Sequence, residues 1–113
     1  MTVAITPTHD EVTAALTIPR FRAWLESKDP EGYAGELRAC GRCPIAKFLR
    51  AQFPGVEPLR IFSHTVRWGE RDAFIPAPKW VLEFVARADA NATEWITPVH
   101  CLRILAWVEK ALA

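Results

Sequence analysis

The chain has 113 residues, of which half are apolar and about a quarter are charged, and it contains five Trp and six Phe. This apolar content is enough to bury a core within one domain, so the composition excludes an intrinsically disordered chain. The formal net charge is only +1, which is atypical of a dedicated nucleic-acid-binding protein. We expect a single globular domain over residues 1–113.

Residues 1–7 are expected to form a loose arm or a short strand. They lack the basic region and the long apolar core of a secretory signal. No apolar run in the chain is long enough to span a bilayer. Three cysteines are an odd number, whereas a secreted scaffold held together by disulfide bonds needs an even one. These features favour a cytoplasmic protein with reduced thiols and no membrane partner.

Two short helices are predicted near the N-terminus. The segment Thr8–Glu11 has the form of a capping box, in which Thr8 and Glu11 satisfy each other's backbone N–H groups. This helix must end near Thr17, because Ile18 precedes a proline and is pushed out of the helical region. Pro19 then lies at the start of the second helix. The apolar stripe of that helix comprises Phe21, Trp24 and Leu25.

The stretch from Cys40 to Phe53 combines a helix start with a possible chemical site. Pro44 is suited to the first helical position, where a missing N–H costs nothing. Cys43 is therefore predicted to be the N-cap, with Cys40 in the preceding turn. The inward face of this helix is predicted to comprise Ile45, Phe48, Leu49 and Phe53.

Residues 57–68 are rich in aromatic and β-branched side chains, which is typical of a strand. Their alternation is imperfect, so a bulge or a break is expected near Ser63 and His64. Residues 69–72 form the turn, and residues 73–75 return as a short second strand. Pro76 and Pro78 prevent a longer strand there.

Two further helices complete the chain. Pro78 begins one over residues 78–89, and Thr97 caps the last one, with Pro98 at its first position. Apolar residues cover most of the circumference of the last helix, so we expect it to be central. Both helices are expected to pack against residues 44–53. The fold class is therefore α+β and predominantly helical, with about five helices and one small antiparallel hairpin.

Charge is distributed unevenly along the chain. Residues 38–71 contain seven basic and two acidic residues, a net charge of +5, between acidic flanks. Arg outnumbers Lys by ten to four, which favours directional pairing. If the basic groups share one face, that face can bind an acidic protein surface. The predicted contact residues are Arg38, Arg42, Arg50, Arg60, Arg67 and Trp68.

Two other interpretations of this segment remain open. Arginines beside aromatic rings can bind phosphates and stack on bases, with Trp68 and Phe62 as the free rings, so nucleic acid is a possible partner. Alternatively, the basic residues scatter over several faces and pair with the acidic flanks.

The pair Cys40-x-x-Cys43 also has three interpretations. Its spacing suits zinc, with Cys101 and His64 completing a set of four ligands. A thiol at a helix N-terminus is also suited to redox chemistry, because the helix dipole stabilises the thiolate. The third interpretation is that these small residues only pack the helix start.

The sequence contains no Gly-x-Ser-x-Gly, no His-Glu-x-x-His and no Gly-rich phosphate loop. We therefore expect a small non-enzymatic binding module that acts through an Arg-rich face, of the adaptor, regulator or phage and mobile-element inhibitor type. No cofactor is expected, with zinc as the alternative.

Overall fold

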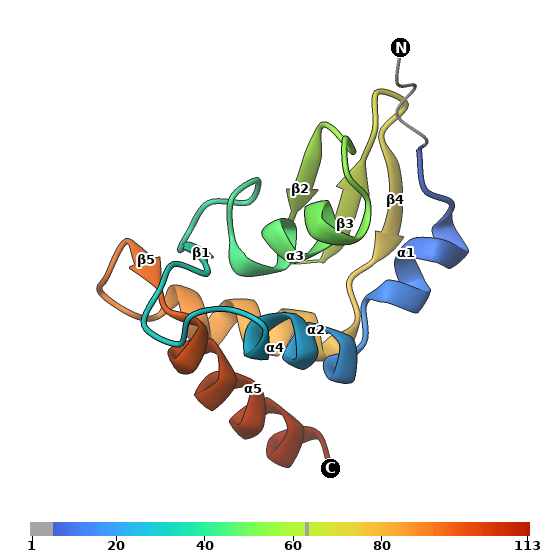
Figure 1. Ribbon diagram of the computed structural model, residues 1–113. Coiled ribbons are helices and arrows are strands. Elements are labelled where there is room, and N and C mark those ends of the chain that lie inside the picture. The colour runs from blue at the N-terminus through green and yellow to red at the C-terminus, as the bar shows by residue number, and fades with distance from the viewer. Residues whose placement is uncertain (1–5, 63) are drawn as a thin grey trace.

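Five helices and two small antiparallel sheets form the part of the chain that the structure, a computed structural model, describes: residues 6–62 and 64–113 (Figure 1). The α+β, predominantly helical class is thus confirmed. The helices are α1 (His9–Ala15), α2 (Ile18–Glu26), α3 (Pro44–Gln52), α4 (Lys79–Asp89) and α5 (Pro98–Leu112). The strands are β1 (Gly35–Glu36), β2 (Leu59–Ile61), β3 (Thr65–Trp68), β4 (Ala73–Pro76) and β5 (Trp95–Ile96).

Local signals set the helix starts. The Thr8 hydroxyl accepts from the Glu11 N–H at 3.1 Å, and the Glu11 carboxylate accepts from the Thr8 N–H at 2.9 Å, so the capping box is present. Thr17 and Thr97 cap α2 and α5 through their hydroxyls. Cys43 is the N-cap of α3 as expected, although its side chain makes no capping hydrogen bond. Pro78 is the N-cap of α4 rather than its first residue.

A three-stranded antiparallel sheet of order β2-β3-β4 replaces the expected hairpin. The region predicted as one interrupted strand is two strands, because the chain reverses between Phe62 and Thr65, where the Phe62 N–H donates to the Thr65 carbonyl at 2.9 Å. Ser63, at the predicted break, lies outside the described residues, as do residues 1–5 of the predicted arm. Thr6 and Pro7 are not in a strand.

The second sheet, a ribbon of two residues from each of β1 and β5, was not expected. Gly35 pairs with Ile96, and Glu36 pairs with Trp95. A β-carbon on Gly35 would lie 2.6 Å from the Pro44 backbone nitrogen, so only glycine lets β1 approach the start of α3 this closely. The ribbon is therefore fixed against α3.

Aromatic rings fill the centre of the core. Phe21 of α2 is fully buried, and its ring lies 5.1–6.0 Å from four other aromatic rings, measured between centroids. These rings come from α2, α3 and α4 and belong to Trp24, Phe48, Trp80 and Phe84. Edge-to-face and offset aromatic contacts of this kind add to the stabilisation from area burial.

The helices pack differently from the expectation. α5 packs mainly against α4 and α2, whereas α3 packs against β2, α1, α2 and β1. An ion pair between Arg22 and Glu109 also joins α2 to α5. α5 is not surrounded, since Trp107 and Leu112 are 41 % and 37 % exposed. The helix has 15 residues, more than either partner, and its C-terminal end lies at the lower edge of the molecule in Figure 1.

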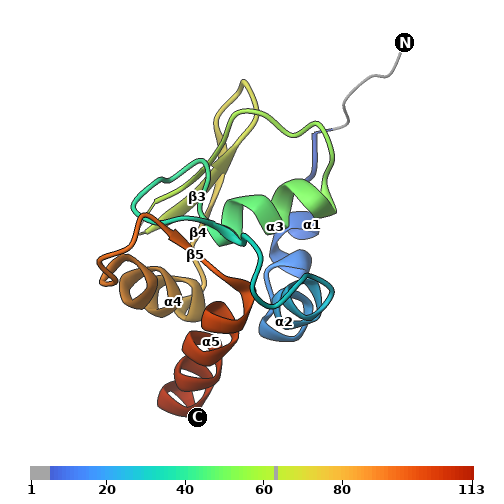
Figure 2. The same ribbon diagram turned by 60° about the vertical axis from the view of Figure 1, so that its left-hand side comes forward.

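The two outer edges of the three-stranded sheet differ in character. On β2, the Ile61 N–H donates to the Cys40 carbonyl at 2.7 Å. On the other side, β4 ends at Pro76, which has no N–H, and packs against α1. α3 and α1 lie on one side of this sheet (Figure 2).

Candidate functional site

The outward face of the three-stranded sheet gathers arginine and phenylalanine side chains. Along β2, β3 and β4, buried residues alternate with more exposed ones, and the buried ones face α1 and α3. On the outward face, Arg60 is paired with Arg67, and Arg67 is paired with Phe74. These three side chains therefore form one row across the sheet.

A second row lies beside the first. Thr65 is paired with Pro76 and accepts from the backbone of Phe62, so these three residues are neighbours across the sheet. Phe62 and Phe74 are 40 % and 49 % exposed. We name the surface formed by Arg60, Phe62, Thr65, Arg67, Phe74 and Pro76 the sheet surface.

The charge on the sheet surface is partly neutralised. The Arg67 guanidinium forms an ion pair with the Asp72 carboxylate at 2.8 Å and lies 4.8 Å from the centroid of the Phe74 ring. Arg60 is exposed and forms no ion pair with any of the described residues. Arg60 is thus the uncompensated positive charge of this surface.

Arg38, another predicted contact residue, is bound within the fold. Its guanidinium donates at 2.7–3.0 Å to the carbonyl of Asp89, the last residue of α4, and to those of Asn91 and Thr93 in the segment that follows. Its backbone N–H donates to the Asp89 carboxylate at 2.9 Å. Arg38 therefore satisfies the carbonyl of the last residue of α4 and holds the segment between α4 and β5 in place.

Two more of the predicted arginines have partners within the chain. Arg50 pairs with the Glu57 carboxylate at 2.7 Å and donates to the Gly41 carbonyl. Arg42 pairs with Glu36 at 2.8 Å, although its side chain is 72 % exposed. The basic segment therefore does not form one arginine-rich face, and only Arg60 and Arg67 of the predicted arginines are paired across the sheet.

The expectation that Trp68 is a free ring is wrong. Trp68 lies on the inward face of β3, is 1 % exposed, and donates its indole N–H to the Pro7 carbonyl at 2.9 Å. Its ring also makes an edge-to-face contact with His9. Phe62, the other ring that was expected to be free, is exposed. Phe74 was not identified as a site residue, although the turn at residues 69–72 would have aligned it with Arg67.

The predicted zinc set is not assembled. In the described part of the chain, no three Cys, His, Asp or Glu residues are grouped to hold a metal ion. Cys43 and Cys101 are buried in the core, whereas Cys40 and His64 are exposed. The zinc interpretation therefore fails on geometry.

The two buried thiols are also not activated as the redox interpretation requires. Burial raises the pKa of Cys43 to about 11, against the smaller lowering effect of the N–H groups of Ala46 and Ile45. Burial likewise raises the pKa of Cys101 to about 12. Desolvation of the thiolate thus outweighs the helix N-terminus. The packing interpretation of the pair agrees with the burial of Cys43 but not with the exposure of Cys40.

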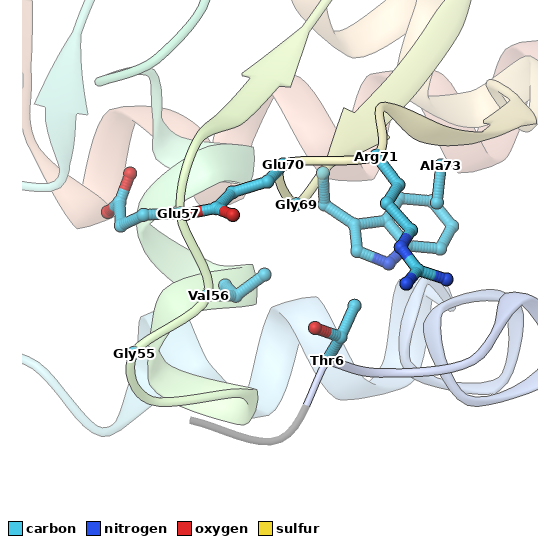
Figure 3. A pocket seen from close by; sticks show the side chains of 9 residues that line it. Thr6, Gly55, Val56, Glu57, Gly69, Glu70, Arg71 and Ala73 are labelled. Atoms are coloured by element: carbon cyan, nitrogen blue, oxygen red, sulfur yellow. The ribbon is translucent and has the colours of Figure 1, made fainter. Parts of the chain in front are cut away.

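A hollow of about 720 Å³ lies between the turn after α3 and the turn between β3 and β4 (Figure 3). Among the described residues that line it, the charged ones are Glu57, Glu70 and Arg71, with Trp68 and Val56 contributing apolar wall. Glu57 is held by Arg50. The hollow thus offers a mixed polar wall for binding, and no metal-binding group of three residues is formed there among the residues described.

A smaller cleft lies at the β1–β5 ribbon, where Tyr33 and Trp95 are 45 % and 50 % exposed. Sequence reasoning missed both residues, because each stands alone in a polar segment. The only feature of the sequence that could have indicated them is a large aromatic side chain in a segment otherwise typical of a loop.

Comparison with protein-family models, with curated proteins and with solved structures gives no match in any of the three. In the described part of the chain, no helix has the length and apolar character needed to cross a membrane. The fold and its exposed surfaces therefore define a small α+β domain with an open sheet face, and any function has to be argued from those surfaces.

Proposed function

We propose that this protein is a non-enzymatic binding module that uses the sheet surface to contact an acidic surface of a partner protein. The observation that supports the proposal is the row of Arg60, Arg67 and Phe74 across the sheet, with Phe62 exposed beside it. Arginine and aromatic side chains are enriched at the energetic centres of protein interfaces. We place this function in the cytoplasm, in keeping with the three free cysteines.

The sheet also supplies a rigid support for such contacts. The two arginines stand on strands between buried residues, Arg60 between Leu59 and Ile61 and Arg67 between Val66 and Trp68. Arg67 is further held by Asp72 and Phe74. Less side-chain entropy is then lost on binding, because these groups are already ordered. Arg60 supplies the net charge that would select an acidic partner.

The test is affinity capture with the immobilised protein, followed by quantitative comparison of variants. Arg60→Glu combined with Phe74→Ser removes the free charge and one exposed ring, and we expect it to lose the captured partner. Arg103→Glu is the matched control, because Arg103 is exposed on α5 and the charge change is the same. Thermal unfolding must show that both variants are folded. Equal capture by wild type and the Arg60→Glu/Phe74→Ser variant contradicts the proposal.

Single-stranded nucleic acid is the second candidate, because two exposed phenylalanines beside arginines on an open sheet face suit base stacking and phosphate contact. A labelled mixed-sequence 20-nucleotide strand, titrated at several salt concentrations, distinguishes the two. For this candidate we expect the affinity to fall steeply with salt, and Arg60→Ala to reduce the slope by about one. Absence of binding at low salt excludes it and leaves the protein partner.

A further inference from the structure

The aromatic pair at the β1–β5 ribbon, at the left of Figure 1, is held in a fixed geometry. The ring centroids of Tyr33 and Trp95 lie 6.3 Å apart with an angle of 37° between the rings. Backbone hydrogen bonds fix both segments, from the Ala34 N–H to the Ile96 carbonyl and from the Leu37 N–H to the Glu94 carbonyl, at 2.9 and 2.8 Å. The rings are therefore held by the fold although both are about half exposed.

Hollows border this pair. One of about 370 Å³ is lined by Glu31, Gly32, Tyr33 and Trp95. The other, of about 470 Å³, is lined in part by Glu36, Arg42 and Glu94 as well as the two rings. Each hollow can therefore accept a side chain against an aromatic ring with a carboxylate nearby.

Among the exposed Phe, Tyr and Trp rings of the described chain, only Trp95 and Phe62 have no cation of the chain over them. Cations of the chain itself lie over four aromatic rings: Lys28 over Trp24, Lys47 over Tyr33, Arg67 over Phe74 and Arg87 over Trp107. Trp95 is the most exposed large hydrophobic residue of the described chain, and none of its described Lys or Arg residues lies over that ring.

The charges around Trp95 are suited to an external cation. Glu31 and Glu94 are exposed, and neither forms an ion pair with the described residues. Of the two arginines that line the larger hollow, Arg42 is held by Glu36, and Arg38 is held by backbone carbonyls at and after the end of α4. An uncovered indole beside free carboxylates attracts a positive group through both the ring quadrupole and the carboxylate charge.

We propose that Trp95, together with Glu31 and Glu94, forms a binding site for an arginine side chain of a basic peptide segment, with Tyr33, over which Lys47 already lies, lining its side. The planar guanidinium stacks on Trp95 and donates to the carboxylates, which a lysine ammonium does less well. This site takes a cationic ligand, whereas the sheet surface carries a net positive charge, so the two surfaces select partners of opposite charge.

The experiment is an NMR titration of the ¹⁵N-labelled full chain with the peptide acetyl-Gly-Arg-Gly-Arg-Gly-amide. Trp95→Phe assigns the indole N–H signal of Trp95. We expect this signal to shift saturably, and the citrulline analogue, which has the same shape without the charge, to bind about fivefold more weakly. We expect Glu31→Gln/Glu94→Gln to weaken binding of the arginine peptide by a similar factor, and Trp107→Leu, the matched control on α5, to leave it unchanged.

Three results would overturn the proposal. They are an indole signal of Trp95 that does not move, equal affinities for the arginine and citrulline peptides, and unchanged affinity in the Glu31→Gln/Glu94→Gln variant. The citrulline comparison uses only the wild-type protein, so it remains decisive if a variant fails to fold.

Discussion

Replacement of Arg38 tests whether this arginine of the basic segment stabilises the fold. Arg38 has a positive φ of 57°, which is rare for a residue other than glycine, and its guanidinium binds three carbonyls at and just after the end of α4. A hydrogen bond of this kind contributes about 0.5–1.5 kcal/mol, and exposure places these three near the lower end. We therefore expect Arg38→Ala to reduce the free energy of unfolding by about 2 kcal/mol.

Arg38→Gly separates the side chain from the backbone. Glycine loses the same three hydrogen bonds but adopts the left-handed conformation without the strain of a β-carbon, which is about 1–2 kcal/mol. Its greater freedom in the unfolded chain offsets part of this gain. We expect Arg38→Gly to be more stable than Arg38→Ala by about 1 kcal/mol.

Urea denaturation followed by circular dichroism measures both differences, and an unchanged m-value shows that the comparison is between like states. Arg60→Ala is the control, because Arg60 is exposed on the sheet surface, and we expect a change within about 0.5 kcal/mol. If Arg38→Ala is as stable as wild type, or Arg38→Gly is less stable than Arg38→Ala, the structural role of this arginine is refuted.

Two further outcomes follow from the packing and the thiols. We expect Gly35→Ala to reduce the free energy of unfolding by about 3 kcal/mol in urea denaturation, because the new β-carbon meets the backbone of Cys43 and Pro44. A reduction below about 1 kcal/mol contradicts the close approach. Burial raises the pKa values of Cys43 and Cys101 to about 11 and 12, from an ordinary value of 9.0, so the folded protein retains protons that the unfolded chain releases. The stability that these protonated thiols contribute is complete below pH 9 and is lost as the pH rises through 11 and 12. In urea denaturation from pH 8 to 11, we expect the free energy of unfolding to fall more steeply with pH for wild type than for Cys43→Ala/Cys101→Ala. Equal pH dependence of the two proteins would contradict this.

The helix starts could be predicted from the sequence because the interactions that fix them are local. The capping box of Thr8 and Glu11 lies within four residues, and the pairs Cys43–Pro44 and Thr97–Pro98 need only adjacent residues. The strands were harder to predict from the sequence. β1 and β5 pair across about sixty residues, and no local pattern indicates that Gly35 and Ile96 meet.

The contact residues were predicted poorly for a related reason. The direction of Arg38 is set by carbonyls more than fifty residues further along the chain, so a count of charges in its own segment says nothing about it. For Trp68, alternation defines two faces of the strand, but only the packing of α1 and α3 decides which face is buried. Arg60 and Arg67 meet only because the chain reverses between them, whereas the sequence pattern predicted one interrupted strand there.

The two edges of the three-stranded sheet limit how this protein can associate. Exposed strand edges are templates on which further strands add, either in peptide recognition or in fibrils. Here the Ile61 N–H of β2 already donates to the Cys40 carbonyl. On β4, which packs against α1, Pro76 has no N–H to donate. Main-chain pairing with a second molecule is therefore disfavoured at both edges, and recognition is left to side chains, whose identity can change without altering the sheet.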